Sequence, residues 1–379
     1  MRTGHHYNDK VSAALHRRIG QLAVVGFAGP AIGAELSALA REFGLGGIIL
    51  FKRNVESPEQ VADLAAGAQA LTGDLPLWVG LDQEGGRVAR LKSPLTEWPP
   101  MLALGRSDDE GLAGRFAAAL ARELAAVGVS IDFAPVLDVL TSANNPAIGD
   151  RALSGDPDVV ARLGAAFVRG LQGGGVAACG KHFPGHGDTM VDSHLDLPVV
   201  EHPLERLRQI DWVPFKAAID AGVAAIMTGH LLVPALDERQ PATLSRAIVT
   251  GRLREELGFD SLVFTDDMEM KAIAGRLAPD MAAVQAIAAG CDVLLLCGTD
   301  IAAHASALEA LIRAVEREEI PRARVDAAEA RQRRAKERFA ALGTTSLAPG
   351  WRPAPARDLR SRLGCVEHQL VAEEMRRFA

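Results

Sequence analysis

The chain has 379 residues, of which 48% are hydrophobic and 23% are charged, and its formal net charge is −7 at pH 7. This composition is typical of a globular protein with a large apolar core. The acidic balance, the lack of a basic tract and the lack of a long charge-free apolar run predict a protein with no nucleic-acid partner and no membrane partner.

The amino-terminal residues and the cysteines predict a cytoplasmic location. The first residues contain neither the apolar stretch nor the small-residue cleavage site of a signal peptide. No C-x-x-C pair occurs, and free thiols in a reducing compartment are the simplest interpretation of the four cysteines, Cys179, Cys291, Cys297 and Cys365.

Eight short apolar runs follow one another along the chain. They are continuous rather than alternating, which is typical of strands buried on both faces of a parallel sheet. The runs cover residues 22–27, 46–51, 77–82, 130–136, 176–182, 224–230, 261–267 and 291–298.

The segments between these runs carry helix start and stop signals. Ser57 followed by Pro58 predicts a helix start, with Gln60 closing a capping box, and "SDDE" at 107–110 predicts the same box before a helix that runs to Gly128. Asp156 before a proline opens another helix, which the glycines at 173–175 close.

Eight strand-then-helix units predict an α/β protein with a single (β/α)₈ TIM-type barrel. An open doubly wound sheet is the alternative, but it would require a G-x-G-x-x-G turn after an early strand, and the sequence has none. We place the barrel at residues 1–343 and a Pro-rich connector with a C-terminal helical extension at 344–379. The extension is expected to pack on the barrel exterior, with a disordered tail as the alternative. Its helical spacing joins Leu359, Leu363, Val366, Leu370 and Met375.

Polar residues fall at the ends of several predicted strands. The third strand ends in Asp82, the fifth in Lys181 and His182, the sixth in His230, and Arg151 lies in the loop after the fourth. Because catalytic groups of such barrels lie at the carboxyl ends of the strands, we expect these side chains to converge on one mouth.

The seventh strand ends in two adjacent aspartates, Asp266 and Asp267. Neighbouring side chains of a strand point to opposite faces, so we expect only one of them to face the mouth. The other could cap the helix that begins in "MEMKAIAG".

The loop "KHFPGHGDTMVDSH" at 181–194 has three interpretations. One is a metal site formed by His182, His186, His194 and Asp188, although the glycines break the spacing that a helical zinc motif uses. A polar turn without function is another. The third is proton transfer, in which the Asp192 carboxylate supports the imidazole of His194.

This loop, together with "LDQEGGRVARL", "GDRALSGDP" and "VFTDDMEM", resembles the bacterial β-N-acetylglucosaminidases of glycoside hydrolase family 3, the single-domain enzymes of peptidoglycan recycling. The resemblance runs from about residue 18 to residue 340. It implies a retaining mechanism with Asp266 as nucleophile, with His194 as acid/base assisted by Asp192, and with no metal or cofactor. The differences are the tail after residue 348 and the last positions of "TDDMEM".

The resemblance also implies which residues bind the substrate. We expect the substrate to be a small carbohydrate or muropeptide, and the enzyme to be a monomer. The implied sugar contacts are Asp82, Arg90, Arg151, Lys181 and His182, with His230 as a further pocket residue. A phosphorylase, a β-glucosidase-like enzyme of the same superfamily and a non-catalytic sugar-binding protein are the alternatives. For the β-glucosidase type, too little chain follows residue 342 to form the second domain.

Overall fold

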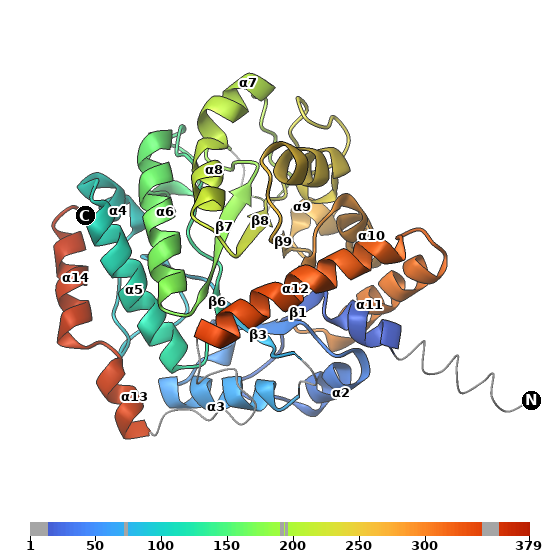
Figure 1. Cartoon of the computed structure of the whole chain (residues 1–379), viewed down its shortest axis with the longest axis horizontal. Helices are drawn as coiled ribbons and strands as arrows, with labels where there is room; N and C mark the ends of the chain where they lie inside the picture. Colours follow the sequence, from blue (N-terminus) through green and yellow to red (C-terminus); the bar gives the residue numbers. More distant parts are fainter. Residues whose placement is uncertain (1–13, 72–74, 190–192, 194–195, 343–355) are drawn as a thin grey trace, which may run out of the picture.

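The computed structural model describes residues 14–71, 75–189, 193, 196–342 and 356–379. Eight parallel strands close into a barrel that helices surround, which confirms the predicted (β/α)₈ fold (Figure 1). Among the described residues, no helix is long and apolar enough to cross a membrane.

The barrel strands follow the predicted runs in order. They are β1 Ala23–Val25, β2 Gly47–Ile49, β3 Trp78–Leu81, β6 Ile131–Asp132, β7 Ala177–Phe183, β8 Ala225–Thr228, β9 Leu262–Asp267 and β10 Val293–Leu296. The ring closes where β1 pairs with β10, with Ala23 opposite Leu294. A short antiparallel hairpin, β4 Gln83–Gly85 and β5 Val88–Ala89, follows β3 directly.

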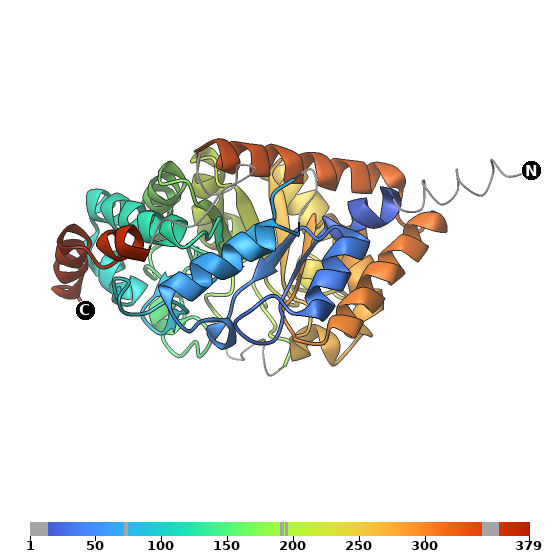
Figure 2. The ribbon, with the colours of Figure 1, turned by 90° about the horizontal axis from the view of Figure 1, so that it is seen from below.

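A helix follows each barrel strand and packs on the outside of the ring (Figures 1 and 2). These helices are α2 Ala34–Phe43, α3 Pro58–Gln69, α5 Glu110–Ala126, α6 Pro157–Gly173, α8 Val213–Asp220, η5 Ala247–Glu256, α10 Pro279–Ala289 and α11 Ile301–Glu316. The connections hold the shorter segments η1 Lys52–Asn54, α4 Met101–Ser107, η2 Gly149–Arg151, α7 Leu204–Arg206, η3 Leu207–Asp211, η4 Ala242–Leu244 and α9 Lys271–Ala274. Helix α12 Arg322–Leu342 and the pair α13 Ala356–Arg362 and α14 Val366–Arg376 complete the described chain.

The side chains that start the helices were predicted correctly in two cases of three. The Ser57 hydroxyl accepts from Gln60 N, and the Asp156 carboxylate caps α6. The box expected at "SDDE" is wrong, because Ser107 is the last residue of α4 and α5 begins two residues later than expected. Its cap is Asp109, whose carboxylate accepts from Leu112 N.

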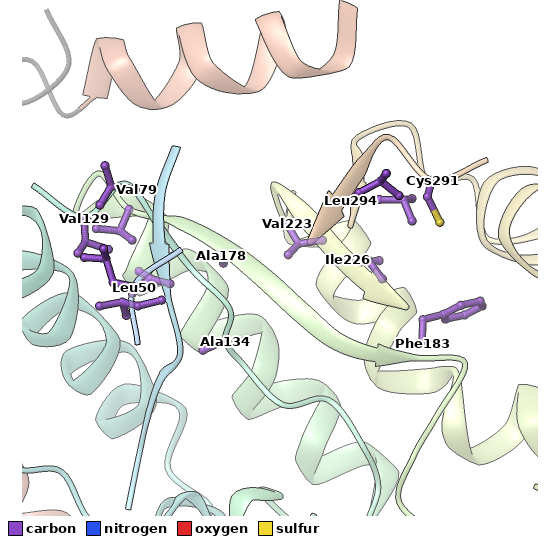
Figure 3. Packing of buried hydrophobic residues seen from close by; sticks show 14 of the residues in the cluster. Leu50, Val79, Val129, Ala134, Ala178, Phe183, Val223, Ile226, Cys291 and Leu294 are labelled. Carbon is purple, nitrogen blue, oxygen red and sulfur yellow. The ribbon is translucent and has the colours of Figure 1, made fainter. Parts of the chain in front are cut away.

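Two apolar layers fill the molecule. Side chains that point outward from the strands pack against the helices, and Figure 3 shows members of this layer such as Val79, Ala178 and Ile226. Side chains that point inward fill the barrel, where Phe133 and Phe264 meet edge to face with ring centroids 5.5 Å apart. The continuous apolar runs of the sequence reflect this burial on both faces.

Helix α12 covers the amino-terminal end of the barrel (Figure 2). Gln332 accepts from Trp78 Nε1 at 2.7 Å, and the buried Lys336 ammonium donates to Gly46 O at 2.8 Å and to Gln21 Oε1 at 3.0 Å. This end of the barrel is therefore closed, and the opposite end is left for a ligand.

The C-terminal extension packs beside α5 and α4 (Figure 1). Leu359, Leu363 and Met375 are buried as expected. The expectation for Val366 and Leu370 is wrong, because these side chains are 76% and 58% exposed. Gly364, at φ +56°, ends α13 and turns the chain, so the buried face of α14 is instead formed by His368, Ala372 and Met375.

Candidate active site

A cavity of about 220 Å³ opens at the carboxyl ends of the strands. Six of the predicted site residues line it, from five different strand ends and loops: Asp82, Arg90, Arg151, Lys181, His182 and Asp266. Its apolar lining includes Phe51, Met227 and Leu295. Its volume lies just below the ~300–1,000 Å³ that is usual for small-molecule sites, so it suits one small polar ligand.

Five charged side chains form a continuous ionic network on one wall of the cavity. Lys181 Nζ lies 2.8 Å from Asp82 Oδ1 and 2.7 Å from Glu84 Oε1. Arg90 Nη2 donates to the other Asp82 oxygen at 2.9 Å, and Arg151 binds Glu84 through two hydrogen bonds of 2.8 and 2.7 Å. The network therefore fixes every charged group through at least one partner.

The network keeps its carboxylates ionised although they are removed from water. Burial alone would raise the pKa of Glu84, but Lys181 and Arg151 outweigh it and lower this pKa to about 2. Burial also opposes ionisation of Asp82, but the charges of Lys181 and Arg90 outweigh it and keep the pKa of Asp82 well below its usual value. The Glu84 and Lys181 side chains are only 1% and 2% exposed. Such a buried ion pair needs all of its partners, because an unpaired buried charge is strongly destabilising.

A second buried carboxylate, Asp138, holds the beginning of the 181–194 loop. Its oxygens accept from His182 Nδ1 at 2.7 Å and from His186 N at 2.7 Å. Burial opposes its ionisation, but the charge of His182 prevails, and the pKa of Asp138 is lowered. The contact sets the orientation of the His182 ring, and His182 lines the cavity.

The two aspartates at the end of β9 both line the cavity, so the expectation that only one would face it is wrong. Asp267 does not cap α9 either. Its Oδ1 accepts from Glu269 N at 3.0 Å and from Cys297 N at 3.2 Å, which ties the end of β9 to the end of β10. The end of a strand loses the strict alternation of its centre as the chain turns, and this explains the shared orientation.

The pKa values of the two neighbouring carboxyl groups shift in opposite directions. Burial disfavours ionisation of Asp266, but His182, His230 and the N–H of Asp267 outweigh it, and the pKa of Asp266 is lowered. Burial, reinforced by the adjacent Asp266 charge, raises the pKa of Asp267 to about 6. Two carboxyl groups whose pKa values are driven apart are typical of sites where each has its own role.

His230, which we expected as a further pocket residue, does not line the cavity. It is fully buried, with Nδ1 2.8 Å from Thr243 Oγ1 and Nε2 2.8 Å from the carbonyl oxygen of Asp267. It follows the end of β8 by two residues, and its ring contacts the backbone of Asp267 instead of entering the cavity. From there its electrostatic effect helps to lower the pKa of Asp266.

The predicted acid/base pair, His194 and Asp192, lies outside the described residues. The neighbouring His186 is described and lines the cavity. Burial and the nearby His182 lower its pKa to about 4, so this ring is neutral near pH 7. Among the residues with described placement, no group of three His, Cys, Asp or Glu side chains could hold a metal ion.

Two important residues of the site were not singled out from the sequence. Glu84 stands two positions after Asp82, and this spacing placed it on the same side of an extended chain. Asp138 stands just after the fourth predicted strand, where barrel enzymes carry functional groups. Both looked like ordinary loop carboxylates because burial cannot be read from a single position.

Residues 14–335 match the sequence model described as "Glycosyl hydrolase family 3 N terminal domain". A curated relative named Beta-hexosaminidase, from Thiobacillus denitrificans, is 44% identical over 261 residues, which cover 67% of this chain and 71% of that protein. A solved glycoside hydrolase family 3 beta-N-acetylglucosaminidase from Paenibacillus sp. is 40% identical with a TM-score of 0.87 and covers 96% of this chain and 68% of its own. A solved structure of NagZ from Neisseria gonorrhoeae in complex with N-trifluoroacetyl-D-glucosamine is also similar. It is 30% identical with a TM-score of 0.74, and the match covers 94% of this chain and 98% of NagZ.

Proposed function

The chain belongs to glycoside hydrolase family 3 and is a glycoside hydrolase, and on this basis we propose that it is a retaining β-N-acetylglucosaminidase. Its substrates would be muropeptides derived from peptidoglycan, from which it releases the terminal non-reducing N-acetylglucosamine. The observation that carries the proposal is the Asp266 carboxyl group in the lining of a small cavity, where its lowered pKa favours the ionised form.

In the first half of the reaction, an Asp266 oxygen attacks the anomeric carbon as the glycosidic C–O bond breaks. The leaving oxygen takes a proton from His194, whose imidazolium the Asp192 carboxylate supports. In the second half, water attacks the anomeric carbon, gives its proton to His194 and displaces Asp266. The lowered pKa of Asp266 supports this assignment, because a nucleophilic carboxylate must be ionised.

The ionic network supplies the contacts that hold the sugar. Asp82 can accept hydrogen bonds from sugar hydroxyls, while Arg90, Arg151 and Lys181 can donate to hydroxyls or to the N-acetyl oxygen. These side chains hold one another in place through ion pairs before the sugar enters. Sugar binding therefore costs little side-chain conformational entropy. The small volume of the cavity favours release of one terminal residue over cleavage within a long chain.

Incubation with a muropeptide and with chitobiose, side by side, tests the proposal. We expect N-acetylglucosamine to be released from both, faster from the muropeptide, with the products identified by mass spectrometry. Faster cleavage of chitobiose would contradict the substrate assignment. Formation of a sugar phosphate in phosphate buffer would show that the enzyme is a phosphorylase and not a hydrolase.

A further inference from the structure

A fully buried carboxylate, Glu123 on α5, joins two distant parts of the chain. It accepts from Thr96 N at 2.8 Å and from Thr96 Oγ1 at 2.7 Å. It also accepts from Gly364 N at 2.9 Å and from His368 Nδ1 at 2.7 Å. Four donors on one buried carboxylate form a rigid junction, because each bond involves a charged acceptor out of water.

On one side, this junction connects to the cavity wall that carries the ionic network. Thr96 belongs to the segment that returns from the β4–β5 hairpin, and this segment holds the hairpin through Gly86 N, which donates to Trp98 O at 2.9 Å. The side chain of Gln83 bonds the backbone of Arg90 and Leu91 and closes the base of the hairpin. Three members of the ionic network therefore belong to this region: Asp82 just before the hairpin, Glu84 in β4 and Arg90 just after β5.

The other side of the junction is the C-terminal extension. Gly364 lies between α13 and α14, and its α carbon is packed so tightly that an added Cβ would come within 2.2 Å of Pro94 O. Arg376 Nη2, at the end of α14, donates to Glu97 O at 2.6 Å. The extension thus contacts residues 94–97 directly at Pro94 and Glu97, and reaches Thr96 indirectly through Glu123. It lies beyond the segment that matches the family model.

We propose that α13 and α14 brace the β4–β5 hairpin, with Glu123 and His368 as positioning residues that hold Asp82, Glu84 and Arg90 in their binding geometry. The inference rests on the proposed function, since it assigns these side chains to sugar binding. The brace acts on the affinity for the sugar and leaves Asp266 unchanged, because β9 lies across the ring from β3.

The test compares three variants of the full chain. His368→Ala removes the donor to Glu123, His368→Asn keeps an N–H donor close to the position of Nδ1, and Glu374→Ala is the matched control. Glu374 is on the same helix, but its carboxylate pairs with the half-exposed Arg115 and does not contact residues 94–98. Two readouts are measured: hydrogen exchange of the amides of Gly86, Arg90 and Leu91, and the KM and kcat for a nitrophenyl N-acetylglucosaminide.

For His368→Ala we expect faster exchange at the three hairpin amides and a KM raised roughly three- to tenfold, the scale of coupling through packed networks, with kcat changed less than twofold. His368→Asn should restore both values, and Glu374→Ala should leave both unchanged. Unaltered hairpin exchange in His368→Ala would overturn the proposal, and so would equal effects of His368→Ala and Glu374→Ala. If the wild type proves inactive on the glycoside, the proposed function fails, and the exchange measurement still decides whether the brace exists.

Discussion

At the scale of single residues, the most informative pair is Asp266 and Asp267. The pKa of the first is lowered, and that of the second is raised to about 6, although they are adjacent in the chain. Below about pH 6, Asp267 is therefore largely protonated, whereas Asp266 stays ionised to a lower pH. In the proposed reaction, only Asp266 would then present a full negative charge to the anomeric carbon.

Substitution separates the two roles. Asp266→Ala should abolish hydrolysis and leave sugar binding largely intact, because the carboxylate forms its bond only as the transition state is reached. Asp267→Ala should instead lower the free energy of unfolding by ~1–3 kcal/mol, since Glu269 N and Cys297 N lose their acceptor. A mechanism-based fluorosugar, followed by peptide mass mapping, checks the assignment. Labelling of Asp267 would exchange the two roles.

The role proposed for His194 predicts a dependence on the leaving group. His194→Ala should lose roughly 10²–10⁴-fold in kcat/KM on a disaccharide, and much less on a nitrophenyl glycoside whose phenolate departs without a proton. Asp192→Ala should show the same pattern more weakly, because it only supports the ring. The measurement is kcat/KM across leaving groups of graded pKa. An equal loss on all of them would assign His194 to binding alone, and the low pKa of His186 makes that residue a poor substitute as acid.

The sequence predicted the members of the site better than their connections. Asp82, Lys181 and Asp266 were identifiable because each ends an apolar run, and strand ends of a barrel meet at one mouth. The partnership of Glu84 with Lys181 joins residues almost a hundred positions apart, and only the closed ring brings them together. A single sequence contains no signal for such a contact.

At the scale of elements, the strands were predicted well and the helix starts less well. Continuous apolar runs mark strands buried on both faces, and all eight occur where expected. The start of α5 was misplaced because Ser107, Asp108 and Asp109 are all acceptable caps, and the choice depends on where α4 ends. The exposure of Val366 and Leu370 follows from the turn at Gly364, which a helical spacing argument does not foresee.

Helix α12 makes the stability of the barrel depend on pH through Lys336. Burial alone lowers the pKa of this ammonium group to about 7, below its ordinary value of 10.5. Between pH 7 and pH 10.5 the unfolded chain therefore binds more protons than the folded chain. The free energy of unfolding rises with pH over this range, and the gain is absent once the pH has fallen below about 7.

Lys336→Met should remove this pH dependence. Relative to the variant, the wild type should gain up to a few kcal/mol in free energy of unfolding between pH 6 and pH 10, measured by urea denaturation at each pH. Lys216→Met, on the exposed face of α8, is the control and should not change the slope. Parallel curves for wild type and Lys336→Met would show that the ammonium remains charged in the folded protein throughout.

At the scale of the whole molecule, several carboxylates at the described part of the barrel mouth have cationic side chains as partners. The carboxylates of the ionic network are paired with Lys181, Arg90 and Arg151, and Asp138 is paired with His182. We therefore predict full activity on the N-acetylglucosaminide after EDTA treatment and dialysis. The assay compares treated and untreated enzyme, and a loss that zinc reverses would restore the histidine-cluster interpretation of the 181–194 loop.

The pairing of β1 with β10 also determines the order in which the molecule can be completed on the ribosome. The edge of β1 is synthesised first, and its partner residues, Leu294–Leu296, emerge only after some 270 further residues. Until then, the nascent sheet has two open edges, which are the parts of a sheet that pair with other chains. We therefore expect the unfinished chain to need protection by chaperones during synthesis, and truncation before residue 293 to yield aggregates rather than a smaller barrel.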